Sequence, residues 1–228
     1  MILAAHQPQF IPWLGYFDKM LHCDLFVLLD DVQFKKNEWQ NRNKIWSREG
    51  GQWLTVPVLH VFPSEIRAVK INNTAAWKHK HVATLTQTYS HAAAFERSWE
   101  PWRKMYDQER ASMLEINLYS IEELRKALGV TTPLKLSSGL GVEGRSTERL
   151  VALCRKAGAD TYLAGAGGKD YMDMKLFEAA GIKVAFQDYP HPVYSQFGGS
   201  SVSHLSALDA VFHHGADAAK ILRSTRGT

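Results

Sequence analysis

A short run of apolar residues, Leu25 to Leu29, constrains the fold of this chain more than any other stretch. Acidic residues bound the run on both sides, with Asp24 before it and Asp30-Asp31 after it. An apolar run without polar alternation is typical of a strand that is buried on both faces, as parallel strands are when helices cover their sheet. The sequence therefore predicts a buried strand over residues 24–31.

The residues before this run complete a βαβ unit. Ile2 to Ala5 is a second short apolar run, which predicts another strand. Trp13 to His22 carries aromatic and aliphatic residues at helical spacing, and Pro12 suits the first turn of that helix. Strand, loop, helix and strand in this order form the connection that joins parallel strands.

The same order returns in the second half of the chain. The patterns predict strands over residues 134–138, 160–164 and 181–186, and helices over residues 147–157 and 169–180. Loops rich in small residues separate them. The alternation predicts an α/β protein with a Rossmann-like, mostly parallel sheet.

The middle of the chain follows a different pattern. It predicts a helix over residues 77–89, a helical region in two pieces over 95–128, and extended segments at 52–58 and 66–71 that pair. An aromatic stripe at helical spacing indicates core packing rather than cofactor contacts; it consists of Trp99, Trp102, Met105 and Tyr106. With a last helix over 206–212, the prediction is one α/β domain over residues 1–223, a helical and extended insertion at about 72–128, and a frayed tail at 224–228.

Composition limits the class of protein. The chain has 228 residues, of which 45% are hydrophobic, and this suffices for a substantial core. No window holds about 18 consecutive apolar residues, and no signal peptide is recognisable, so we expect a cytoplasmic protein without a membrane segment. Cys23 and Cys154 have neither metal-type nor redox-type spacing and are expected to be small core residues.

A net charge of +4 and a pI near 9.0 favour anionic partners. The cations are concentrated between Lys35 and Arg48, where Trp39 and Trp46 stand among them. Such a segment can hold a phosphate and stack a ring, or it can be a solvated edge with both tryptophans packed inward. Ordered nucleic-acid motifs are absent, so nucleic acid is not an expected partner.

The loop after the first strand holds the first candidate for chemistry. It begins His6-Gln7-Pro8-Gln9, and ligands of open α/β sheets lie beyond the carboxyl ends of the strands. His6 is the predicted catalytic residue, because an imidazole with a usual pKa near ~6.5 can accept a proton at physiological pH. Gln7 and Gln9 are predicted to orient a substrate. Structural roles in bracing this loop remain open for all three residues.

Two acidic residues and two histidines were weighed as metal ligands. Asp30 and Asp31 are adjacent on extended backbone, which points them to opposite faces, so turn formation or pairing with a lysine is favoured over a shared ion. His79 and His81 diverge by roughly 200° on a helix and are expected to belong to a solvated basic face. The sequence predicts no metal site.

Later loops offer residues that suit an anionic ligand. The segment 137–149 leads from a strand into a helix and either holds an anion or is an ordinary loop capped by Ser146 or Thr147. It matches neither the P-loop nor the dinucleotide motif. Arg42, Arg149 and Lys169 are predicted to hold an anionic donor. Gly165 and Gly167, in the glycine-rich turn that follows the next strand, are predicted to bind substrate.

The stretch near the carboxyl end adds a second group of candidates. His191 lies between Pro190 and Pro192 and is predicted as a second acid or base, although the prolines alone account for a turn. Tyr194 and Gln196 precede a glycine- and serine-rich turn and are predicted to bind substrate from a segment over the site. Plain loop packing remains an alternative for them.

Four blocks of this sequence resemble the WbqC-like family. They are residues 6–19, which read His-Gln-Pro-Gln-Phe-Ile-Pro-Trp-Leu-Gly-Tyr-Phe-Asp-Lys, then 146–150, 162–171, and 194–196 followed by 205–209. Together they span nearly the whole chain. Because such proteins are associated with cell-surface polysaccharide and related small-molecule biosynthesis, the resemblance implies a biosynthetic enzyme. Ala164 stands where the family often has serine, which weakens any role for a hydroxyl there.

A weaker likeness is to nucleotidylyltransferases of the HIGH superfamily. His6 after the first strand and Gly15-Tyr16 at the first helix resemble the spacing of their nucleotide-binding motif. Tyr16, predicted as a substrate contact, stands where a second histidine is expected, and tyrosine supplies no cation to a phosphate at neutral pH. The likeness therefore extends to the fold more than to adenylyl transfer.

The sequence favours a transferase acting on an activated sugar or acyl donor, in cell-surface polysaccharide biosynthesis such as that of O-antigen, or in specialised-metabolite biosynthesis. Its expected partner is an anionic small-molecule donor, such as a nucleotide sugar or an acyl carrier, and no cofactor is identified. One alternative is a noncatalytic binding or assembly partner in a biosynthetic complex. A nucleotidylyltransferase-like enzyme is another.

Overall fold

The computed structural model describes residues 1–199 and 201–224, and these divide into two compact units. The first comprises residues 1–7, 18–32 and 131–189, and the second residues 8–17, 33–130 and 190–228. The boundary passes through helix α1 (Leu14–Leu21), which was predicted over residues 13–22. The expectation of a single domain over residues 1–223 stays a prediction.

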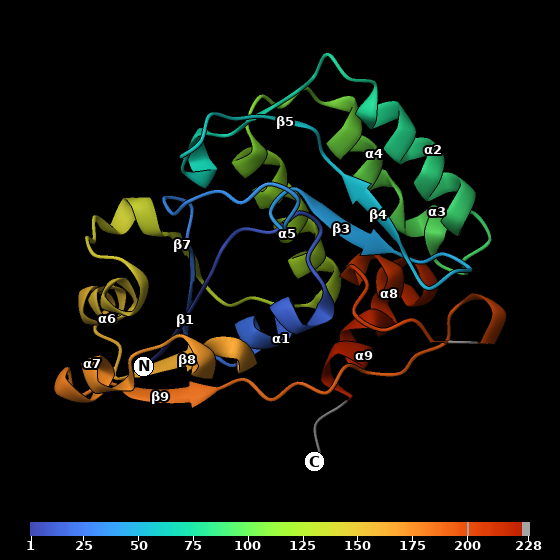
Figure 1. The fold of residues 1–228 in the computed structure, drawn as a ribbon. Helices are drawn as coiled ribbons and strands as arrows, with labels where there is room; N and C mark the ends of the chain where they lie inside the picture. Colours follow the sequence, from blue (N-terminus) through green and yellow to red (C-terminus); the bar gives the residue numbers. More distant parts are fainter. Residues whose placement is uncertain (200, 225–228) are drawn as a thin grey trace. The chain divides into compact units, whose positions relative to one another are not determined.

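A five-stranded parallel sheet forms the first unit (Figure 1). Its strands are β1 (Ile2–His6), β2 (Leu25–Leu28), β7 (Leu134–Leu136), β8 (Thr161–Ala164) and β9 (Lys183–Phe186), in the spatial order β7-β2-β1-β8-β9. The fully apolar Leu25–Leu28 segment is buried along its whole length, as its lack of alternation predicts. The α/β, Rossmann-like prediction is confirmed.

One face of this sheet packs against helices α6 (Ser146–Ala157) and α7 (Met174–Ala179). Alternate strand residues supply that face, among them Leu3, Val27 and Tyr162. Tyr162 stacks on Phe177 of α7 with ring centroids 5.4 Å apart. Short 3₁₀ turns η2 (Ser137–Leu140) and η3 (Ala166–Asp170) follow β7 and β8, so α7 is shorter than the helix predicted over 169–180.

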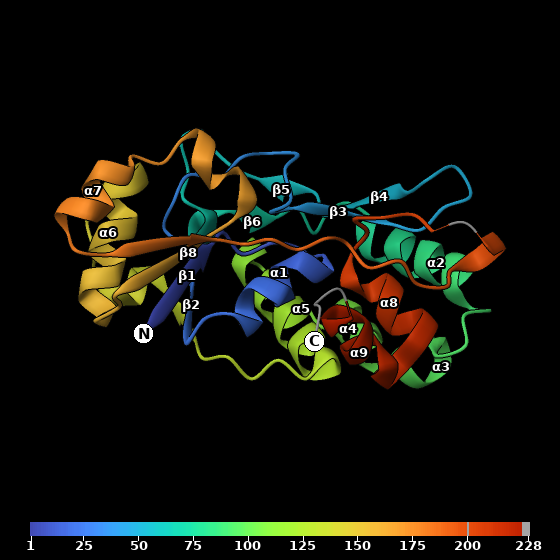
Figure 2. The ribbon, with the colours of Figure 1, turned by 90° about the horizontal axis from the view of Figure 1, so that it is seen from below.

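The second unit is mainly helical. Its helices are α2 (Trp77–Tyr89), α3 (Phe95–Ser98), α4 (Glu100–Asp107), α5 (Met113–Leu128), α8 (Ala207–His214) and α9 (Ala218–Arg223), with turns η1 (Ile66–Ala68), η4 (Phe197–Gly199) and η5 (Gly215–Asp217). Helices α5, α8 and α9 pack against one another (Figure 2). The region 95–128 thus holds three helices rather than two. Ser112 and Glu115 form a capping box that starts α5, and Pro101 lies in the first turn of α4, just after the division from α3.

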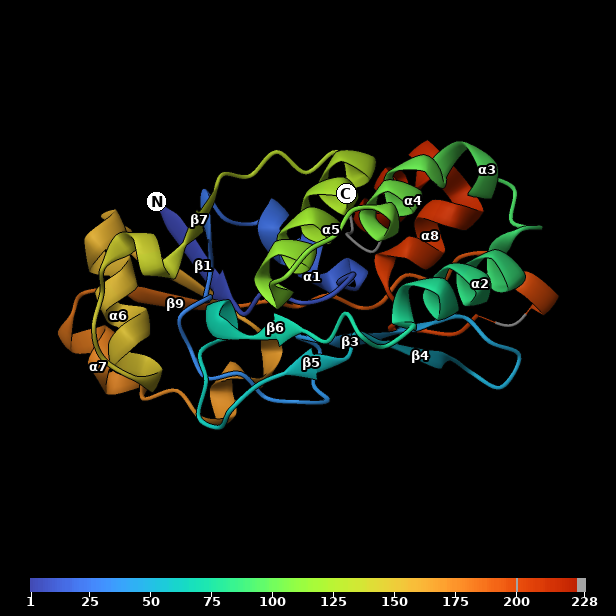
Figure 3. The same cartoon turned by 90° about the horizontal axis from the view of Figure 1, so that it is seen from above.

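Two small antiparallel pairs complete this unit: β3 (Arg42–Ile45) with β4 (Gln52–Thr55), and β5 (Val58–Leu59) with β6 (Lys70–Ile71). Helix α2 runs along the β3–β4 hairpin (Figure 3). The predicted aromatic stripe is core, since Trp102, Met105 and Tyr106 are buried. Of the predicted pairing between 52–58 and 66–71, only the contact of Val58 with Ile71 is found, in the β5–β6 pair. Strand β4 pairs with the unpredicted β3, and residues 66–68 form the turn η1.

Three smaller expectations have clear outcomes. Cys23 and Cys154 are free and buried, as predicted. No helix in the described part of the chain is long and apolar enough to cross a membrane. The predicted frayed tail falls almost wholly on residues 225–228, which lie outside the described residues.

One histidine contradicts its predicted place on a solvated face. His79 is exposed, but His81 is buried between Tyr106 and the backbone of Thr55. Because the Thr55 carbonyl only accepts, His81 Nε2 donates to it at 3.1 Å, and Nδ1 accepts from the Tyr106 hydroxyl at 3.3 Å. Burial lowers the pKa of His81 to about 4, so the ring is neutral.

Candidate functional site

The strand order of the first unit has a switch point at the end of β1. Numbered in chain order within the sheet, the strands lie 3-2-1-4-5, so the chain departs to opposite sides after β1 and after β8. Ligands of open α/β sheets bind at such a switch point, beyond the carboxyl ends of the strands. His6 ends β1 and Gly165 follows β8, so both lie at this edge.

His6 has the tautomer that a general base requires. Its Nδ1 lies 3.1 Å from the backbone carbonyl of Gln7, which can only accept, so the proton is on Nδ1 and Nε2 carries a lone pair. Burial, and secondly the Lys19 ammonium, lower the pKa of His6 to about 4. The imidazole is therefore neutral at physiological pH.

Lys19 and Asp18 are polar residues of this unit that the sequence reasoning missed. The Lys19 side chain is buried and donates to the carbonyl of Ala5 at 3.0 Å, and burial lowers its pKa to about 8. Asp18 is fully buried and accepts from Gln187, the residue after β9, at 2.7 Å. Both residues close the first of the family-like blocks, and that block was the available signal for them.

A polar cluster follows β2 and β7. Asp30 accepts from the backbone of Ser138 at 3.0 Å and from its hydroxyl at 2.7 Å. Asp31 lies 2.5 Å from Nη2 of Arg149, a half-buried side chain on α6. The hydroxyl of Ser137 contacts both carboxylates. The cluster therefore fixes the guanidinium of Arg149 at the same carboxyl edge.

The expectation that Asp30 and Asp31 point to opposite faces is wrong. Strand β2 ends at Leu28, so the two residues are no longer on extended strand backbone and both turn toward Ser137. Asp31 pairs with an arginine, Arg149, rather than with the predicted lysine. Among the described residues, no group of three or more histidine, cysteine or acidic side chains is placed to hold a metal ion.

The start of α6 is not capped as the ordinary-loop alternative requires. No side-chain hydrogen bond caps this helix, and the Thr147 hydroxyl instead accepts from the backbone of Asp173 at 3.0 Å. Ser146 has a positive φ of 48°. Thr147 thus ties α6 to the start of α7.

The glycine-rich turn after β8 has one glycine with a packing reason. A Cβ at Gly168 would lie 2.9 Å from the sulfur of Met172 and 3.1 Å from Cβ of Ala164. A Cβ at Gly165 or Gly167 would meet nothing within 4 Å, so the space beside them is open. The ammonium of Lys169, an exposed side chain, lies 5.0 Å from the ring centroid of Phe186.

The loop that follows β1 continues into the second unit, where buried amides hold it. Asn117 donates to the carbonyls of Pro8 and Gln40, and Asn43 donates to those of Phe10 and Ile11. Ile11 has a φ of 38°, a strained value for a β-branched residue. Gln9 is buried, and its Oε1 has no hydrogen-bond partner among the described residues.

His191 lies in an aromatic group of the second unit. Its ring stacks on Trp13 at 6.2 Å and lies 4.9 Å from His204. Nδ1 donates to the carbonyl of Pro192 at 2.9 Å, and burial lowers the pKa of His191 to about 4. The Trp13 ring lies against Gly15, where a Cβ would be 2.2 Å from it, so Gly15 serves packing.

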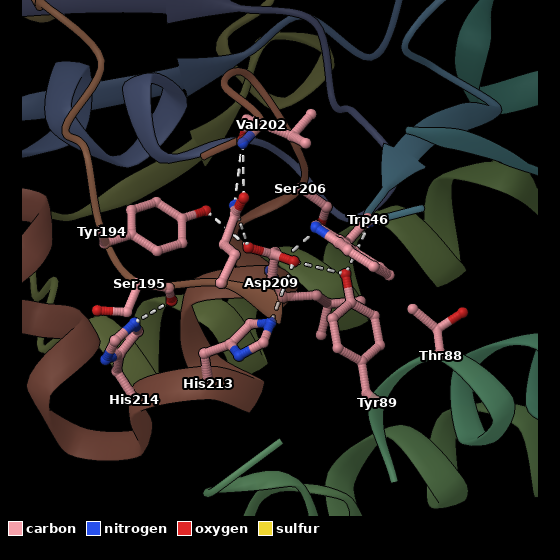
Figure 4. A network of polar contacts seen from close by, with 12 residues as sticks. Trp46, Thr88, Tyr89, Tyr194, Ser195, Val202, Ser206, Asp209, His213 and His214 are labelled. Carbon is pink, nitrogen blue, oxygen red and sulfur yellow. Dashed lines mark hydrogen bonds and ion pairs between the residues drawn. The ribbon is translucent and has the colours of Figure 1, made fainter. Parts of the chain in front are cut away.

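Tyr194 and Gln196 converge on a buried carboxylate (Figure 4). Asp209 accepts from the Tyr194 hydroxyl at 2.9 Å, from Gln196 Nε2 at 2.7 Å and from the Tyr89 hydroxyl at 2.8 Å. His213 Nε2 lies 3.8 Å from the same carboxylate. Burial raises the pKa of Asp209 to about 6, against the effect of these hydrogen bonds.

The structure thus divides the predicted site residues between the units. His6, Gln7, Arg149, Gly165, Gly167 and Lys169 belong to the first, and Gln9, Tyr16, Arg42, His191, Tyr194 and Gln196 to the second. Tyr16 is buried, and the Arg42 guanidinium lies 4.1 Å above the Trp53 ring. Their substrate and catalytic roles stay predictions. Asp209 was missed, although it closes the last family-like block.

A parallel sheet in this strand order, with an imidazole and a fixed guanidinium at its carboxyl edge, defines a Rossmann-like α/β protein with a candidate site at the switch point. The chain belongs to the WbqC-like protein family, whose model matches residues 7–221. The resemblance of the four sequence blocks is thereby confirmed.

A curated relative covers almost the same length. The chain is 35% identical over 228 residues to the uncharacterized protein Rv1507c of Mycobacterium tuberculosis (strain ATCC 25618 / H37Rv), and the match covers 98% of each chain. No solved structure matches.

Proposed function

We propose that this protein is a cytoplasmic biosynthetic transferase that moves a sugar or acyl group from an activated anionic donor to a hydroxyl or amine. The observation that supports this most is the placement of His6 at the switch point of the parallel sheet, with Nε2 unprotonated. Membership of the WbqC-like family supports a role in cell-surface polysaccharide biosynthesis, such as that of O-antigen, or in specialised metabolism.

The proposed step needs one proton acceptor. His6 Nε2 takes the proton of the acceptor hydroxyl or amine while the freed electron pair forms a bond to the electrophilic carbon of the donor. The bond from that carbon to the phosphate or thiol leaving group breaks, and the leaving group keeps its electron pair. Arg149, on helix α6, and Lys169, in the turn η3 after β8, hold the anionic part of the donor.

The low pKa of His6 fits this order of events. In the free protein the pKa is about 4, and Lys19 contributes to lowering it. A bound anion beside the ring stabilises the imidazolium and raises the pKa toward neutrality. His6 thus becomes a stronger base when the donor is in place.

Replacing His6 with glutamine tests the role of the imidazole. Nucleotides, nucleotide sugars and acyl donors are screened by thermal shift, where a ligand at ~100 times its Kd stabilises the fold by ~2.7 kcal/mol. With the donor so found, H6Q is expected to keep donor binding and to form product about 10²–10⁴-fold more slowly. H79Q, at an exposed histidine, is the control.

Two outcomes would contradict the proposal. The first is unchanged product formation by H6Q, which removes His6 as the base. The second is the absence of a thermal shift with every anionic donor, since the proposed mechanism requires one to bind.

A second candidate function, a noncatalytic assembly partner, is favoured by one surface feature. Trp39 and Trp53 are both exposed and lie 5.2 Å apart, and the cations of Arg42 and Lys44 lie over the Trp53 ring. Exposed aromatic residues interleaved with cations suit contact with an acidic protein surface.

If the protein is an assembly partner, substitutions of the exposed tryptophans, rather than of His6, are expected to impair its function. In a reconstituted pathway, W53A is expected to abolish co-elution of this chain with partner enzymes in size-exclusion chromatography, while H6Q leaves both co-elution and product formation unchanged. Co-elution that survives W53A combined with W39A would exclude this surface as the contact.

No observation favours the third function, nucleotidylyl transfer. Tyr16 is buried, and burial raises its pKa well above the usual value, so it carries no charge that could hold a phosphate. The likeness to the HIGH superfamily stays a prediction about the fold.

A further inference from the structure

An open pocket of the helical unit is lined by none of the residues of the proposed mechanism. It has a volume of about 930 Å³, and its lining comes from the β3–β4 hairpin, helix α2 and the Phe197–Gly198 turn. All of its lining residues belong to the second unit, whereas His6, Arg149 and Lys169 belong to the first. This volume lies in the range of small-molecule sites.

Hydrogen bonds fix one wall of the pocket. Gln52 Nε2 donates to the carbonyl of Trp46 at 3.3 Å and to the hydroxyl of Thr88 at 3.1 Å. Both amide hydrogens are thereby used, so Oε1 of Gln52 is the group left to accept from a ligand. The Thr88 oxygen accepts from Gln52, so its hydroxyl hydrogen is available to donate.

The same wall is anchored to the buried Asp209. The backbone N–H of Trp46 donates to the Tyr89 hydroxyl at 3.0 Å, and that hydroxyl donates to Asp209 at 2.8 Å. Figure 4 shows Trp46 and the Tyr89 hydroxyl to one side of the Asp209 carboxylate, with Thr88 on that same side. A wall fixed in this way costs a ligand less ordering when it binds.

Two aromatic side chains supply the apolar surface. The rings of Trp46 and Phe197 lie 5.2 Å apart at 72° to each other, and the Phe197 ring also packs on His213 at 4.5 Å. Neither Trp46 nor Phe197 is fully buried. Partly open aromatic faces suit the flat side of a sugar or a base.

The charge of the pocket has one sign. Among the described residues that line it, Arg48 is the only arginine or lysine, one histidine, His91, is present, and none is acidic. Polar groups of α2 lie at helical spacing along the same wall, at Thr84, Gln87 and Thr88. The lining therefore offers one guanidinium, two aromatic faces and a row of hydrogen-bonding groups.

We propose that this pocket binds a small ring compound that carries one phosphate and free hydroxyl groups. Arg48 pairs with the phosphate, the ring packs on Trp46 and Phe197, and the hydroxyls bond to Gln52 and Thr88. The pocket shares no residue with the site of the transferase proposal, and this proposal does not depend on that one.

Isothermal titration calorimetry with four probes tests this binding. Glucose 1-phosphate and uridine 5′-monophosphate are compared with glucose and uridine, which lack the phosphate. At least one phosphorylated probe is expected to bind, and more than tenfold more tightly than its uncharged counterpart. The two probes distinguish a sugar from a nucleoside as the ring.

Variants identify the pocket as the place of binding. R48Q is expected to weaken the phosphorylated probe about tenfold, and T88V to weaken it severalfold. R67Q, at another exposed arginine of the same unit, serves as the matched control and is expected to bind like the original protein. Near-UV circular dichroism checks that each variant is folded.

The proposal is overturned if neither phosphorylated probe binds at millimolar concentration, or if R48Q binds as the original protein does. Inorganic phosphate alone, binding as tightly as the ring compounds, would exclude the aromatic contacts. H6Q and R149Q must leave this binding unchanged. A loss in those two variants would assign the bound probe to the sheet edge instead.

Discussion

Replacing Asp209 with alanine is expected to lower the free energy of unfolding by about 3–5 kcal/mol. Three donors converge on this carboxylate, from Tyr89, Tyr194 and Gln196, at 2.7–2.9 Å. Alanine would remove the acceptor that these three donors share, and each buried polar group left unsatisfied costs about 1–3 kcal/mol. Urea unfolding followed by far-UV circular dichroism measures the change.

The asparagine variant separates shape from charge. D209N keeps one side-chain oxygen, and the Tyr89 hydroxyl can turn to accept from the new amide, so a smaller loss of about 1–2 kcal/mol is expected. D209N as costly as D209A would show that the negative charge, rather than the hydrogen-bond geometry, holds this network together.

The pH dependence of D209N has a defined sign. Burial raises the pKa of Asp209 to about 6, above that of the unfolded chain, so its favourable contribution is complete at low pH and is lost as the pH rises through about 6. Asparagine does not titrate. The free energy of unfolding of D209N is lower than that of the original protein, and this difference is therefore expected to be about 1 kcal/mol larger at pH 5 than at pH 8. A deficit that is larger at pH 8 would contradict the raised pKa.

Acid is expected to destabilise the protein between about pH 6.5 and 4, and His81 is the group we expect to contribute most clearly. Its pKa falls from near 6.5 in the unfolded chain to about 4 in the folded protein. Stability from this residue is complete above about pH 6.5 and is lost as the pH falls toward 4, by about 3 kcal/mol in all.

Glutamine at position 81 tests this directly. Its amide can donate to the Thr55 carbonyl and accept from the Tyr106 hydroxyl, as the imidazole does, but it does not titrate in this range. Urea unfolding of H81Q from pH 4 to 8 is expected to show a shallower loss of stability toward acid. Identical slopes for both proteins would show that His81 does not titrate as described.

The free energy of unfolding of H81Q is still expected to fall as the pH is lowered. His6, His191 and His213 also have pKa values lowered to about 4 by burial, and they act in the same direction. Asp209 acts in the opposite direction over part of this range. The difference between H81Q and the original protein isolates one histidine from this sum.

Sequence patterns predicted the parallel sheet well because its strands are governed by local burial. β2 is apolar throughout, since helices or other segments cover both of its faces. β3 was missed because Asn43, at an inward position, is polar: its amide binds the carbonyls of Phe10 and Ile11, which hides the usual alternation. Helix α9 was missed because its six residues are too few to show a clear period.

The candidate site was predictable only where strand ends mark it. His6 and the turn at Gly165 follow apolar runs directly, so their place at the sheet edge follows from chain order. The role of Asp209 could not be predicted in this way, because it depends on a hydrogen bond from Tyr89, which lies 120 positions earlier. Lys19 was likewise hidden, since its pKa depends on burial that no local pattern records.

The place of β1 in the sheet has a consequence for the order of events during synthesis. Of the five strands of this sheet, β1 is synthesised first, and it is the central strand of the finished sheet, between β2 and β8. Its neighbour β2 follows at once, but Ile2 pairs with Thr161, so the other edge of β1 stays unpaired until most of the chain has emerged. Translation that stops before residue 161 leaves that backbone edge exposed to other chains.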